Sequence, residues 1–294
     1  MKQESKFKRS IYGIANMLIS DSMYTRLKFK RNLKYWPDLK NPRTFNEKLC
    51  WLKLHHRDPM MSIMVDKADV KKFVADILGE EYIIPTYGVW ERVEDIDFDS
   101  LPKKFVMKGT HDSGRVIVCV DKESLDVGKA RNEMQLSLNR DFYAITREWP
   151  YKNVPHRIIA EKFIQQSDGG LTDYKFFCFN GHVDCVMVCL DRHIGDTKFF
   201  FFDKDWNFMR LNKRGVAAPE NFTLPRPNGI DKMFEIASEL SKGQPFLRVD
   251  LYNVDGKIYF GELTFYPDGG VDPNILRSTD ERWGNLLDLN VLAK

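Results

Sequence analysis

The second half of the chain contains a series of short strand-like runs separated by turn signals. Asn180-Gly181 and Asp255-Gly256 each connect two such runs, and both dipeptides are typical of two-residue hairpin turns. Strands joined by hairpins pair antiparallel, so this half is predicted to form an antiparallel sheet. The runs are rich in β-branched and aromatic residues and comprise residues 157–164, 174–180, 182–190, 198–203, 246–254 and 257–267.

The first half is predicted to be mainly helical. Thr44 and Glu47 form a capping box for a helix that continues through Leu54. Residues 66–78 have apolar side chains at helical spacing. Further predicted elements are strands at 82–84, 105–108 and 116–120, a polar helix within 122–148, an amphipathic helix at 230–242 and one tail helix at 280–294. Helices mixed with hairpin-connected strands predict an α+β fold with mainly antiparallel sheets.

Charge is distributed unevenly along a chain whose net charge is only +3. Residues 1–48 carry twelve Lys and Arg against four Asp and Glu, an excess of +8, which leaves about −5 for the remainder. The small net charge argues against a dedicated nucleic-acid binder. The basic region indicates either contact with an anionic surface or substrate, or a solvated helical face.

The five cysteines and the N-terminal residues bear on the cellular compartment. No cysteine pair has the C-x2-C spacing of a zinc site, and most lie in apolar runs, so reduced, buried thiols of a cytoplasmic protein are expected. Residues 11–19 are interrupted by Gly13 and Asn16, which argues against a signal peptide. No run approaches the roughly 18 apolar residues of a membrane helix.

The hairpin at residues 246–264 is the strongest candidate for a functional site. Asp250 and Glu262 lie on its two strands at an offset that can place both side chains near one another on one face. Carboxylates within apolar strands are costly unless they are paired or bound to a cation, and Mg²⁺ prefers oxygen ligands. Arg248 is predicted to point the same way as Asp250. A solvent-facing edge with a salt bridge from Arg248 is the alternative.

Two further segments carry cations at strand ends or within strands. Lys108 ends an apolar strand just before the glycine-containing turn GTHDSGR, a combination that suits phosphates. His111 in this turn is a weaker candidate for a base. Lys175 lies within an aromatic strand, where either an anionic ligand or extension to an exposed edge would explain it. The fingerprints GxGxxG, GxxxxGK[ST], GxSxG and HExxH are absent.

Taken in order, these segments resemble the TupA-like ATP-grasp family, which is found with teichuronopeptide and surface-polysaccharide biosynthesis. The resemblance extends from about residue 25 to about residue 290. It rests on NPRTFNEKLCWLKL (41–54), DKADVKKFV (66–74), YIIPTYGVW (82–90), IDFDSLPKKFVMKGTHDSG (96–114), RIIAEKFI (157–164), DYKFFCFNG (173–181) and FLRVDLYNVDGKIYFGELTFYPDGG (246–270).

The resemblance implies an ATP-grasp fold with two α+β lobes whose mainly antiparallel sheets sandwich the nucleotide. Residues 1–60 would be a helical basic N-terminal region. Residues 61–155 would form the N-terminal and small ATP-grasp lobes, and residues 156–294 the C-terminal lobe with the metal site.

The resemblance also implies positions for the adenosine part of ATP. Glu161 would approach the adenine amino group. The backbone of Lys162, Phe163 and Ile164 would form the hinge of the cleft. Asp168 or Asp173 would hold the ribose hydroxyls.

Cations would contact the phosphates in this scheme. Lys108 would contact the α- and β-phosphates, and Lys175 the β- and γ-phosphates, with Lys67 as an earlier basic contact. A flexible phosphate loop at residues 109–114 would include Gly109, Ser113 and Gly114.

The reaction centre implied by the resemblance lies on the last hairpin. Asp250 and Glu262 would hold Mg²⁺. Arg248, together with Lys108, would be catalytic and would stabilise an acyl phosphate. Thr264 occupies the position where many ATP-grasp enzymes have an asparagine metal ligand, which leaves a second Mg²⁺ site open.

These inferences predict an ATP- and Mg²⁺-dependent carboxylate–amine ligase of surface-polysaccharide (capsule, O-antigen or teichuronopeptide) biosynthesis, joining an amino acid to a uronic acid. Its partners would be an anionic glycan or glycolipid acceptor and an amine, with no nucleic acid. Residues 1–48 would suit the inner membrane face. The alternatives are a glycosyltransferase, with D-x-D motifs at residues 97–99 and 203–205, and a nucleotide-binding protein without catalysis.

Overall fold

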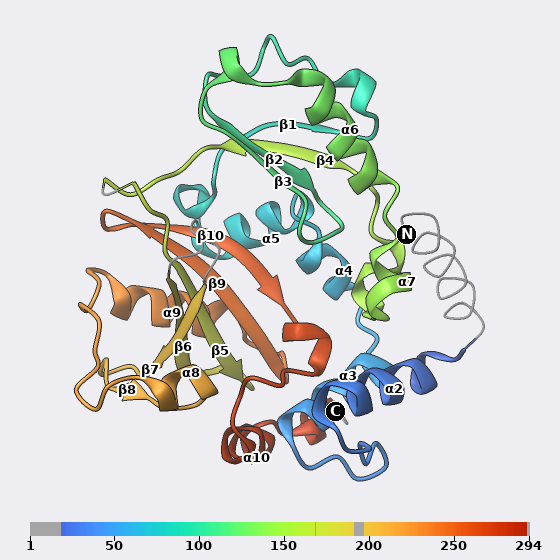
Figure 1. Cartoon of the computed structure of the whole chain (residues 1–294), viewed down its shortest axis with the longest axis vertical. Helices are drawn as coiled ribbons and strands as arrows, with labels where there is room; N and C mark the ends of the chain where they lie inside the picture. Colours follow the sequence, from blue (N-terminus) through green and yellow to red (C-terminus); the bar gives the residue numbers. More distant parts are fainter. Residues whose placement is uncertain (1–18, 168, 191–196, 293–294) are drawn as a thin grey trace, which may run out of the picture.

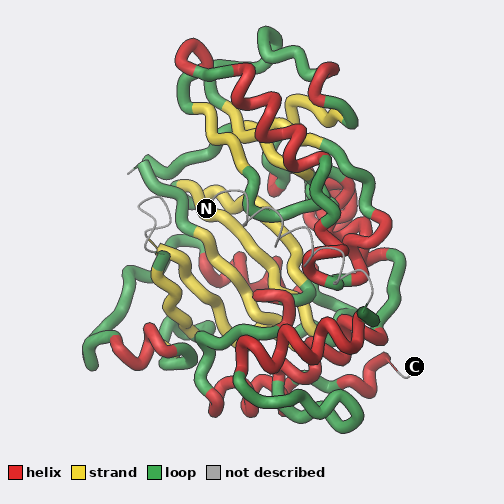
Figure 2. Tube along the Cα trace, turned by 45° about the vertical axis from the view of Figure 1, so that its right-hand side comes forward, coloured by secondary structure: helices red, strands yellow, loops and turns green. Residues whose placement is uncertain are grey.

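The computed structural model describes residues 19–167, 169–190 and 197–292, whose strands form two sheets (Figures 1 and 2). The smaller sheet has four antiparallel strands in the order β1-β4-β2-β3. Helix α6 (Val127–Leu138) packs on β2 and buries Ala130 and Met134 in a core of its own. The strands are β1 (Thr86–Trp90), β2 (Phe105–Gly109), β3 (Val116–Cys119) and β4 (Ile158–Lys162).

The larger sheet has six antiparallel strands in the order β10-β9-β5-β6-β7-β8. Every residue of β5 is buried, as expected for a strand that is covered on both faces. The strands are β5 (Asp173–Phe179), β6 (His182–Leu190), β7 (Lys198–Phe202), β8 (Phe208–Met209), β9 (Phe246–Val254) and β10 (Lys257–Thr264).

Neighbouring phenylalanines on β5 point to opposite faces of the sheet and pack against the helices that cover each face. Phe176 packs edge to face on Phe234 of α9 (Ile230–Leu240). Phe177 points to the other face and stacks on Trp283 of α10 (Arg277–Leu286), which also contacts Phe45 of α3 (Phe45–His55). Burying each such side chain stabilises the fold by roughly 1.5–3 kcal/mol, so β5 anchors both layers.

Both predicted hairpins are confirmed. Asn180 and Gly181 have φ values of 51° and 82°, and Asp255 and Gly256 have 52° and 91°. Two consecutive residues in the left-handed region define the type I′ turn, whose twist matches that of the flanking strands. The capping box of α3 also forms, with Glu47 N donating to Thr44 Oγ1 over 3.3 Å.

Two predicted elements are wrong in detail. Residues 80–82 form a 3-10 turn in which Ile83 N donates to Glu80 O over 3.0 Å, and the strand begins only at Thr86, after Pro85. The tail is not one helix, because α10 ends at Leu286 and a separate 3-10 turn follows.

Several helices connect or flank the sheets. Helices α4 and α5 lie between the two sheets, whereas α2, α3 and α10 lie at the far end of the larger one (Figure 1). Within the described residues, no helix is long and apolar enough to cross a membrane. The remaining helices and 3-10 turns are α2 (Asp21–Leu33), α4 (Met60–Val65), α5 (Asp69–Leu78), α7 (Phe142–Thr146), α8 (Lys213–Ala217), η1 (Glu80–Tyr82), η2 (Val93–Asp95), η3 (Lys122–Ser124), η4 (Trp149–Asn153), η6 (Pro267–Gly270) and η7 (Leu289–Leu292).

The three predicted regions meet the sheets as follows. Strand β4 lies beyond residue 155 yet pairs with β1 and β2 in the smaller sheet, so the chain passes to the larger sheet only after Lys162. The predicted N-terminal region is described from residue 19 and contributes α2 and α3; residues 1–18 lie outside the described part. All five cysteines are buried and unpaired, as expected.

Candidate active site

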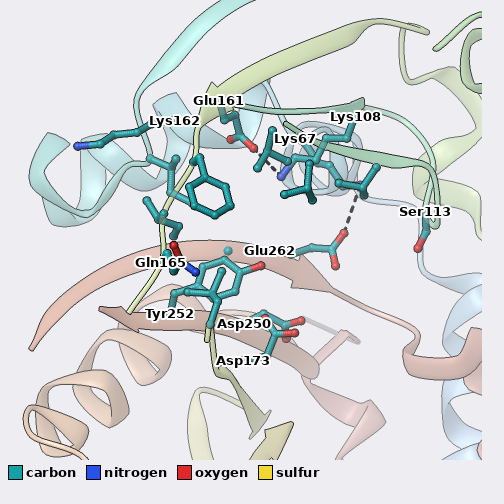
Figure 3. A pocket seen from close by; sticks show the side chains of 18 of the residues that line it. Lys67, Lys108, Ser113, Glu161, Lys162, Gln165, Asp173, Asp250, Tyr252 and Glu262 are labelled. Carbon is teal, nitrogen blue, oxygen red and sulfur yellow. Dashed lines mark ion pairs between the residues drawn. The ribbon is translucent and has the colours of Figure 1, made fainter. Parts of the chain in front are cut away.

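A cleft of about 720 Å³ lies between the two sheets (Figure 3). Strands β2, β3 and β4 form one wall, and β5, β9 and β10 form the other. Most of the predicted site residues line it. They are Lys67, Lys108, Gly109, Ser113, Gly114, Glu161, Lys162, Phe163, Ile164, Asp173, Lys175, Asp250 and Glu262.

Asp250 and Glu262 face each other across β9 and β10, as predicted. Regular pairing outward from the turn would place Gly261 opposite Asp250, but a bulge shifts the register so that Glu262 takes that position. A Cβ at Gly261 would lie 3.0 Å from the carbonyl oxygen of Asp250. The close approach at this bulge therefore favours glycine.

Asp250 is buried in a network of cations rather than placed at a solvent-facing edge. Arg248 donates from Nε to Oδ1 over 2.7 Å and from Nη2 to Oδ2 over 2.8 Å, and Lys175 donates to Oδ2. Arg248 Nη2 also donates to Thr264 Oγ1 over 3.0 Å. Burial alone would lower the pKa of Arg248, but Asp250 and then Glu262 raise it, so the guanidinium stays charged.

Glu262 points into the cleft, where Lys67 reaches it from the segment before α5 (Figure 3). Lys67 Nζ lies 3.3 Å from Glu262 Oε1 and donates to the carbonyl oxygen of Asp112 over 2.7 Å. Burial alone would raise the pKa of Glu262, but Lys67, Arg248 and further cations of the cleft lower it to about 2. The carboxylate is therefore ionised at neutral pH.

Glu161 on β4 is held between two lysines. Lys71 Nζ lies 2.6 Å from Oε1, and Lys108 Nζ lies 2.6 Å from Oε2. Burial alone would raise the pKa of Glu161, but the two lysines lower it. Lys71 was missed by the sequence analysis; its spacing of four residues from Lys67, one helical turn, is the signal that could have identified it.

Lys71 also ties its helix to the smaller sheet. Its Nζ donates to the carbonyl oxygen of Ile84 over 2.6 Å and to Thr86 Oγ1 over 2.8 Å. Helix α5 thus contacts both the strand that carries Glu161 and the strand that begins at Thr86.

The turn between β2 and β3 forms one end of the cleft. Gly109 cannot be replaced without rearrangement, because a Cβ would lie 2.2 Å from Ser137 Oγ and 2.6 Å from Asp112 Oδ1. Gly114 has a φ of 97°, a value that L side chains rarely adopt. Arg140 donates to the carbonyl oxygen of Ser113 and fixes the turn against α6.

The segment after β4 runs along the cleft between the two walls. Lys162 N donates to the carbonyl oxygen of Pro85 over 2.9 Å, and its side chain points away from the cleft (Figure 3). Phe163 and Ile164 line the cleft, as do the valines of β3. Tyr252 and Gln165, which sequence reasoning did not single out, also line the cleft (Figure 3).

Several other predicted positions differ in their surroundings. Asp173 lies 3.8 Å from Lys175 Nζ, whereas Asp168 lies outside the described residues. His111 is buried against His156, with ring centroids 3.9 Å apart, and does not line the cleft. Arg248 and Thr264 are also absent from the lining, and the Thr264 hydroxyl accepts a hydrogen bond from Arg248.

The carboxylates of the cleft fit a magnesium ion that is bound together with a nucleotide, rather than one that is held by protein ligands alone. Mg²⁺ usually takes one or two carboxylates together with substrate phosphates. Glu262 is ionised and faces the cleft, and Asp250 lies directly opposite, although Arg248 and Lys175 occupy its oxygens. No group of three or more His, Cys, Asp or Glu side chains in the described part of the chain is arranged as a metal site.

The family model described as TupA-like ATPgrasp matches residues 47–288. The chain belongs to the TupA-like ATP-grasp family. The predicted family, ATP-grasp fold and enzyme class are thereby confirmed.

Solved structures of other proteins are similar to this chain at low identity. D-alanine–D-alanine ligase from Bacillus anthracis complexed with ATP is 18% identical, with a TM-score of 0.45 over 80% of this chain and 67% of that one. The ATP-grasp ligase PsnB complexed with minimal precursor, Mg and ADP is 11% identical, with a TM-score of 0.40 over 84% and 65%.

The biotin carboxylase domain of 2-oxoglutarate carboxylase from Hydrogenobacter thermophilus, in complex with MgADP, ADP and bicarbonate, is 16% identical, with a TM-score of 0.47. The match covers 79% of this chain and 46% of that one. No curated protein matches the sequence.

Replacing Lys71 tests the clamp on Glu161. Lys71→Met should lower the free energy of unfolding by about 2 kcal/mol, because it removes one of two cations from a buried carboxylate. Lys72→Met is the matched control, since the Lys72 side chain is 83% exposed and pairs with the exposed Asp76; it should change stability by less than about 0.5 kcal/mol. Equal effects in urea unfolding would contradict the clamp.

Glu262 predicts a specific pH dependence of stability. Its folded pKa of about 2 lies below the ordinary value of 4.5, so its stabilising contribution is complete above pH 4.5 and is lost as the pH falls toward 2. The difference in unfolding free energy between wild type and Glu262→Gln should therefore be constant from pH 5 to pH 7 and shrink below pH 4.5. Urea unfolding at several pH values measures it; a difference that stays constant down to pH 2.5 would refute this assignment.

Proposed function

We propose that this protein is an ATP- and Mg²⁺-dependent ligase that joins a carboxylate to an amine through an acyl phosphate. The observation that carries the proposal is the arrangement of charges between the sheets. Lys67, Lys108 and Lys175 line the cleft together with Glu262 and Asp250, and Arg248 donates to Asp250 from outside the lining. The cleft is large enough for a nucleotide. Family membership makes ATP the nucleotide.

The adenine would lie between the hinge segment and the valines of β3, where the lining is apolar. Glu161 and the backbone of residues 162–164 would contact the base, and Asp173 would contact the ribose or the phosphates next to Lys175. Lys108, Lys67 and Lys175 would contact successive phosphates. Gly109, Ser113 and Gly114 would close over them and exclude water.

Transfer of the γ-phosphoryl group needs neutralisation of charge more than covalent chemistry by the protein. Glu262 and Asp250 would hold Mg²⁺, which supplies that neutralisation when bound. Arg248 stays charged beside both carboxylates and would stabilise the acyl phosphate. Thr264 orients Arg248, which supports a positioning role for this residue over that of a ligand to a second Mg²⁺.

The substrates would be a uronic acid of a surface polysaccharide or glycolipid, which provides the carboxylate, and an amino acid, which provides the amine. The family resemblance supports this pathway, and the basic excess of residues 1–48 supports an anionic acceptor or contact with the inner membrane face. A cytoplasmic location would suit this use of ATP.

The glycosyltransferase alternative has less support. Asp97 accepts hydrogen bonds from the backbone of Asp99 and Ser100, and Asp203 accepts from Asn207, so both motifs form local turns. Neither motif lines the cleft. A nucleotide-binding protein without catalysis would not need both Arg248 and the opposed carboxylates.

The first test is the thermal midpoint with Mg-ATP. A nucleotide at about 100 times its Kd stabilises the folded state by about 2.7 kcal/mol. Wild type should show this shift, and Glu262→Ala and Lys108→Met should lose most of it, because each removes a contact to the magnesium or the phosphates. ADP release in a screen of uronic acids with amino acids should follow.

The control for this test is Lys72→Met, whose side chain lies outside the cleft and should leave the nucleotide shift unchanged. A shift with Mn²⁺ and a UDP-sugar but none with Mg-ATP would overturn the ligase and favour the glycosyltransferase. A Mg-ATP shift of equal size in Glu262→Ala would contradict the metal assignment.

A further inference from the structure

Helix α2 has one face against the protein and the opposite face exposed. Thr25 and Phe29 point inward and are fully buried, and Phe29 packs edge to face on Tyr35. Positions four, seven, eight and eleven residues after Met23 share the opposite face, because a helix turns by about 100° per residue. We call this surface, together with the adjoining Trp36, the outer face of α2; its residues are Met23, Leu27, Lys30, Arg31, Lys34 and Trp36.

Three large apolar side chains are exposed on the outer face. The exposed fractions are 48% for Met23, 46% for Leu27 and 56% for Trp36. Met23 and Leu27 are one helical turn apart, and Lys30 Nζ lies 6.0 Å from the centroid of the Trp36 ring, so these side chains belong to one surface. A single exposed apolar residue is ordinary, but a group of them marks a surface that contacts something other than water.

The charges of the outer face are all positive. Lys30, Arg31 and Lys34 lie among the apolar side chains, and no Asp or Glu occurs from residue 22 to residue 37. Lys30 Nζ and Lys34 Nζ donate to backbone carbonyl oxygens at the end of the helix, each over 2.7 Å. Within the described residues, none of these three cations forms an ion pair with a carboxylate. The positive charge of the outer face therefore remains available to an anionic partner.

An anionic lipid bilayer matches both properties of this face. Lys and Arg attract anionic headgroups, apolar side chains beside them enter the boundary between headgroups and acyl chains, and Trp favours that boundary. A soluble polyanion would contact the cations but would gain nothing from Met23 and Leu27. Helix α2 has 13 residues and is about 20 Å long, shorter than the roughly 30 Å hydrocarbon core, so it can lie on a bilayer but cannot cross it.

We propose that the outer face of α2 docks on an anionic membrane surface, with its apolar side chains in the headgroup boundary and its cations on the headgroups. The inference deepens the proposed contact of the basic region with the inner membrane face, and it rests on the proposed function for the nature of the acceptor. The nucleotide cleft takes no part in the docking, so the two proposals are tested separately.

Docking here would bring the membrane close to one end of the cleft. The Tyr143 hydroxyl of α7 donates to Asp21 Oδ2 over 2.6 Å and holds α7 against the start of α2. Arg140, three residues before Tyr143, donates to the carbonyl oxygen of Ser113 in the turn between β2 and β3 that forms this end of the cleft. A few residues thus connect the docking helix to the turn (Figure 1), where an acceptor carried by a lipid would be presented.

The test measures binding of the full chain to lipid vesicles by flotation in a density gradient. Vesicles of phosphatidylcholine alone are compared with vesicles of phosphatidylcholine and phosphatidylglycerol in equal parts. Affinity for the mixed vesicles should be at least about tenfold higher, and the preference should fall as salt is added, because salt screens the charges. The tryptophan emission lost in Trp36→Phe should move to shorter wavelength on the mixed vesicles, as expected for entry into an apolar environment.

Two double variants locate the docking surface. The apolar variant, Met23→Gln with Leu27→Gln, keeps good helix formers at exposed positions and should weaken binding at least about tenfold. The charge variant, Arg31→Gln with Lys34→Asn, should weaken it about twentyfold, since each cation near an anionic surface contributes about fivefold. Asn suits the positive φ of 69° at residue 34, so the end of the helix is kept.

Matched controls carry the same kinds of change on other helices. Leu136→Gln replaces an apolar residue of α6 that is also about half exposed. Lys72→Gln with Lys232→Gln lowers the net charge by the same amount as the charge variant, at exposed positions on α5 and α9. Both controls should bind the mixed vesicles as wild type does.

Each other outcome would overturn the proposal. Wild-type affinity in both α2 variants would place any membrane contact elsewhere in the chain. Loss in the charge variant alone, with binding that a soluble polyuronate displaces, would assign an anionic polymer to this face instead of a bilayer. Absence of binding to the mixed vesicles would leave the face without a lipid partner. All variants should retain the thermal shift with Mg-ATP, and its absence in wild type would contradict the proposed ligase without affecting the docking surface.

Discussion

Two lysines, one just before α5 and one in its first turn, connect the two sheets of this fold. Lys67 pairs with Glu262 on the larger sheet, and Lys71 pairs with Glu161 on the smaller one. Both pKa values are lowered because cations surround the carboxylates, so each is ionised at neutral pH. The ion pairs that link this segment to both sheets therefore also contribute charged groups to the cleft.

The chemistry of the cleft depends on a single register shift. Without the bulge at Gly261, Glu262 would not lie opposite Asp250 and would point to the other face of the sheet, because side chains alternate along a strand. The shift costs backbone hydrogen bonding at one position. The shift places Glu262 opposite Asp250. Arg248 and Lys175 donate to Asp250, whereas Glu262 faces the cleft and pairs with Lys67, so the two acidic residues have different surroundings.

Local patterns predicted the elements that depend on local physics. The type I′ turns at Asn180 and Asp255 follow from the two dipeptides, and the helix after Thr44 follows from its capping box. The 82–84 run failed because its β-prone residues are overruled by a 3-10 turn before Pro85. Lys71 could not be recognised as buried, since a lysine on an amphipathic helix resembles a solvated one until the partner strand is known. Most of the site residues named from the family resemblance line one cleft, whereas Arg248 and Thr264 do not, and Asp168 lies outside the described residues.

The basic N-terminal region illustrates why charge counts alone mislead. Its excess of positive charge suggests a solvated face, yet several of these cations bond to backbone carbonyls: Arg26 to that of Pro37, Lys48 to those of Gly284 and Leu287, and Lys53, from the same helix as Lys48, to that of Gly269. Lys53 is the most buried of the three, and the carboxylate of Glu148 acts on it electrostatically. A hydrogen bond to a carbonyl offsets part of the cost of withdrawing an ammonium group from water. The two lysines of α3 therefore join this helix to α10 and to the turn η6, a role that a count of charges along the sequence does not predict.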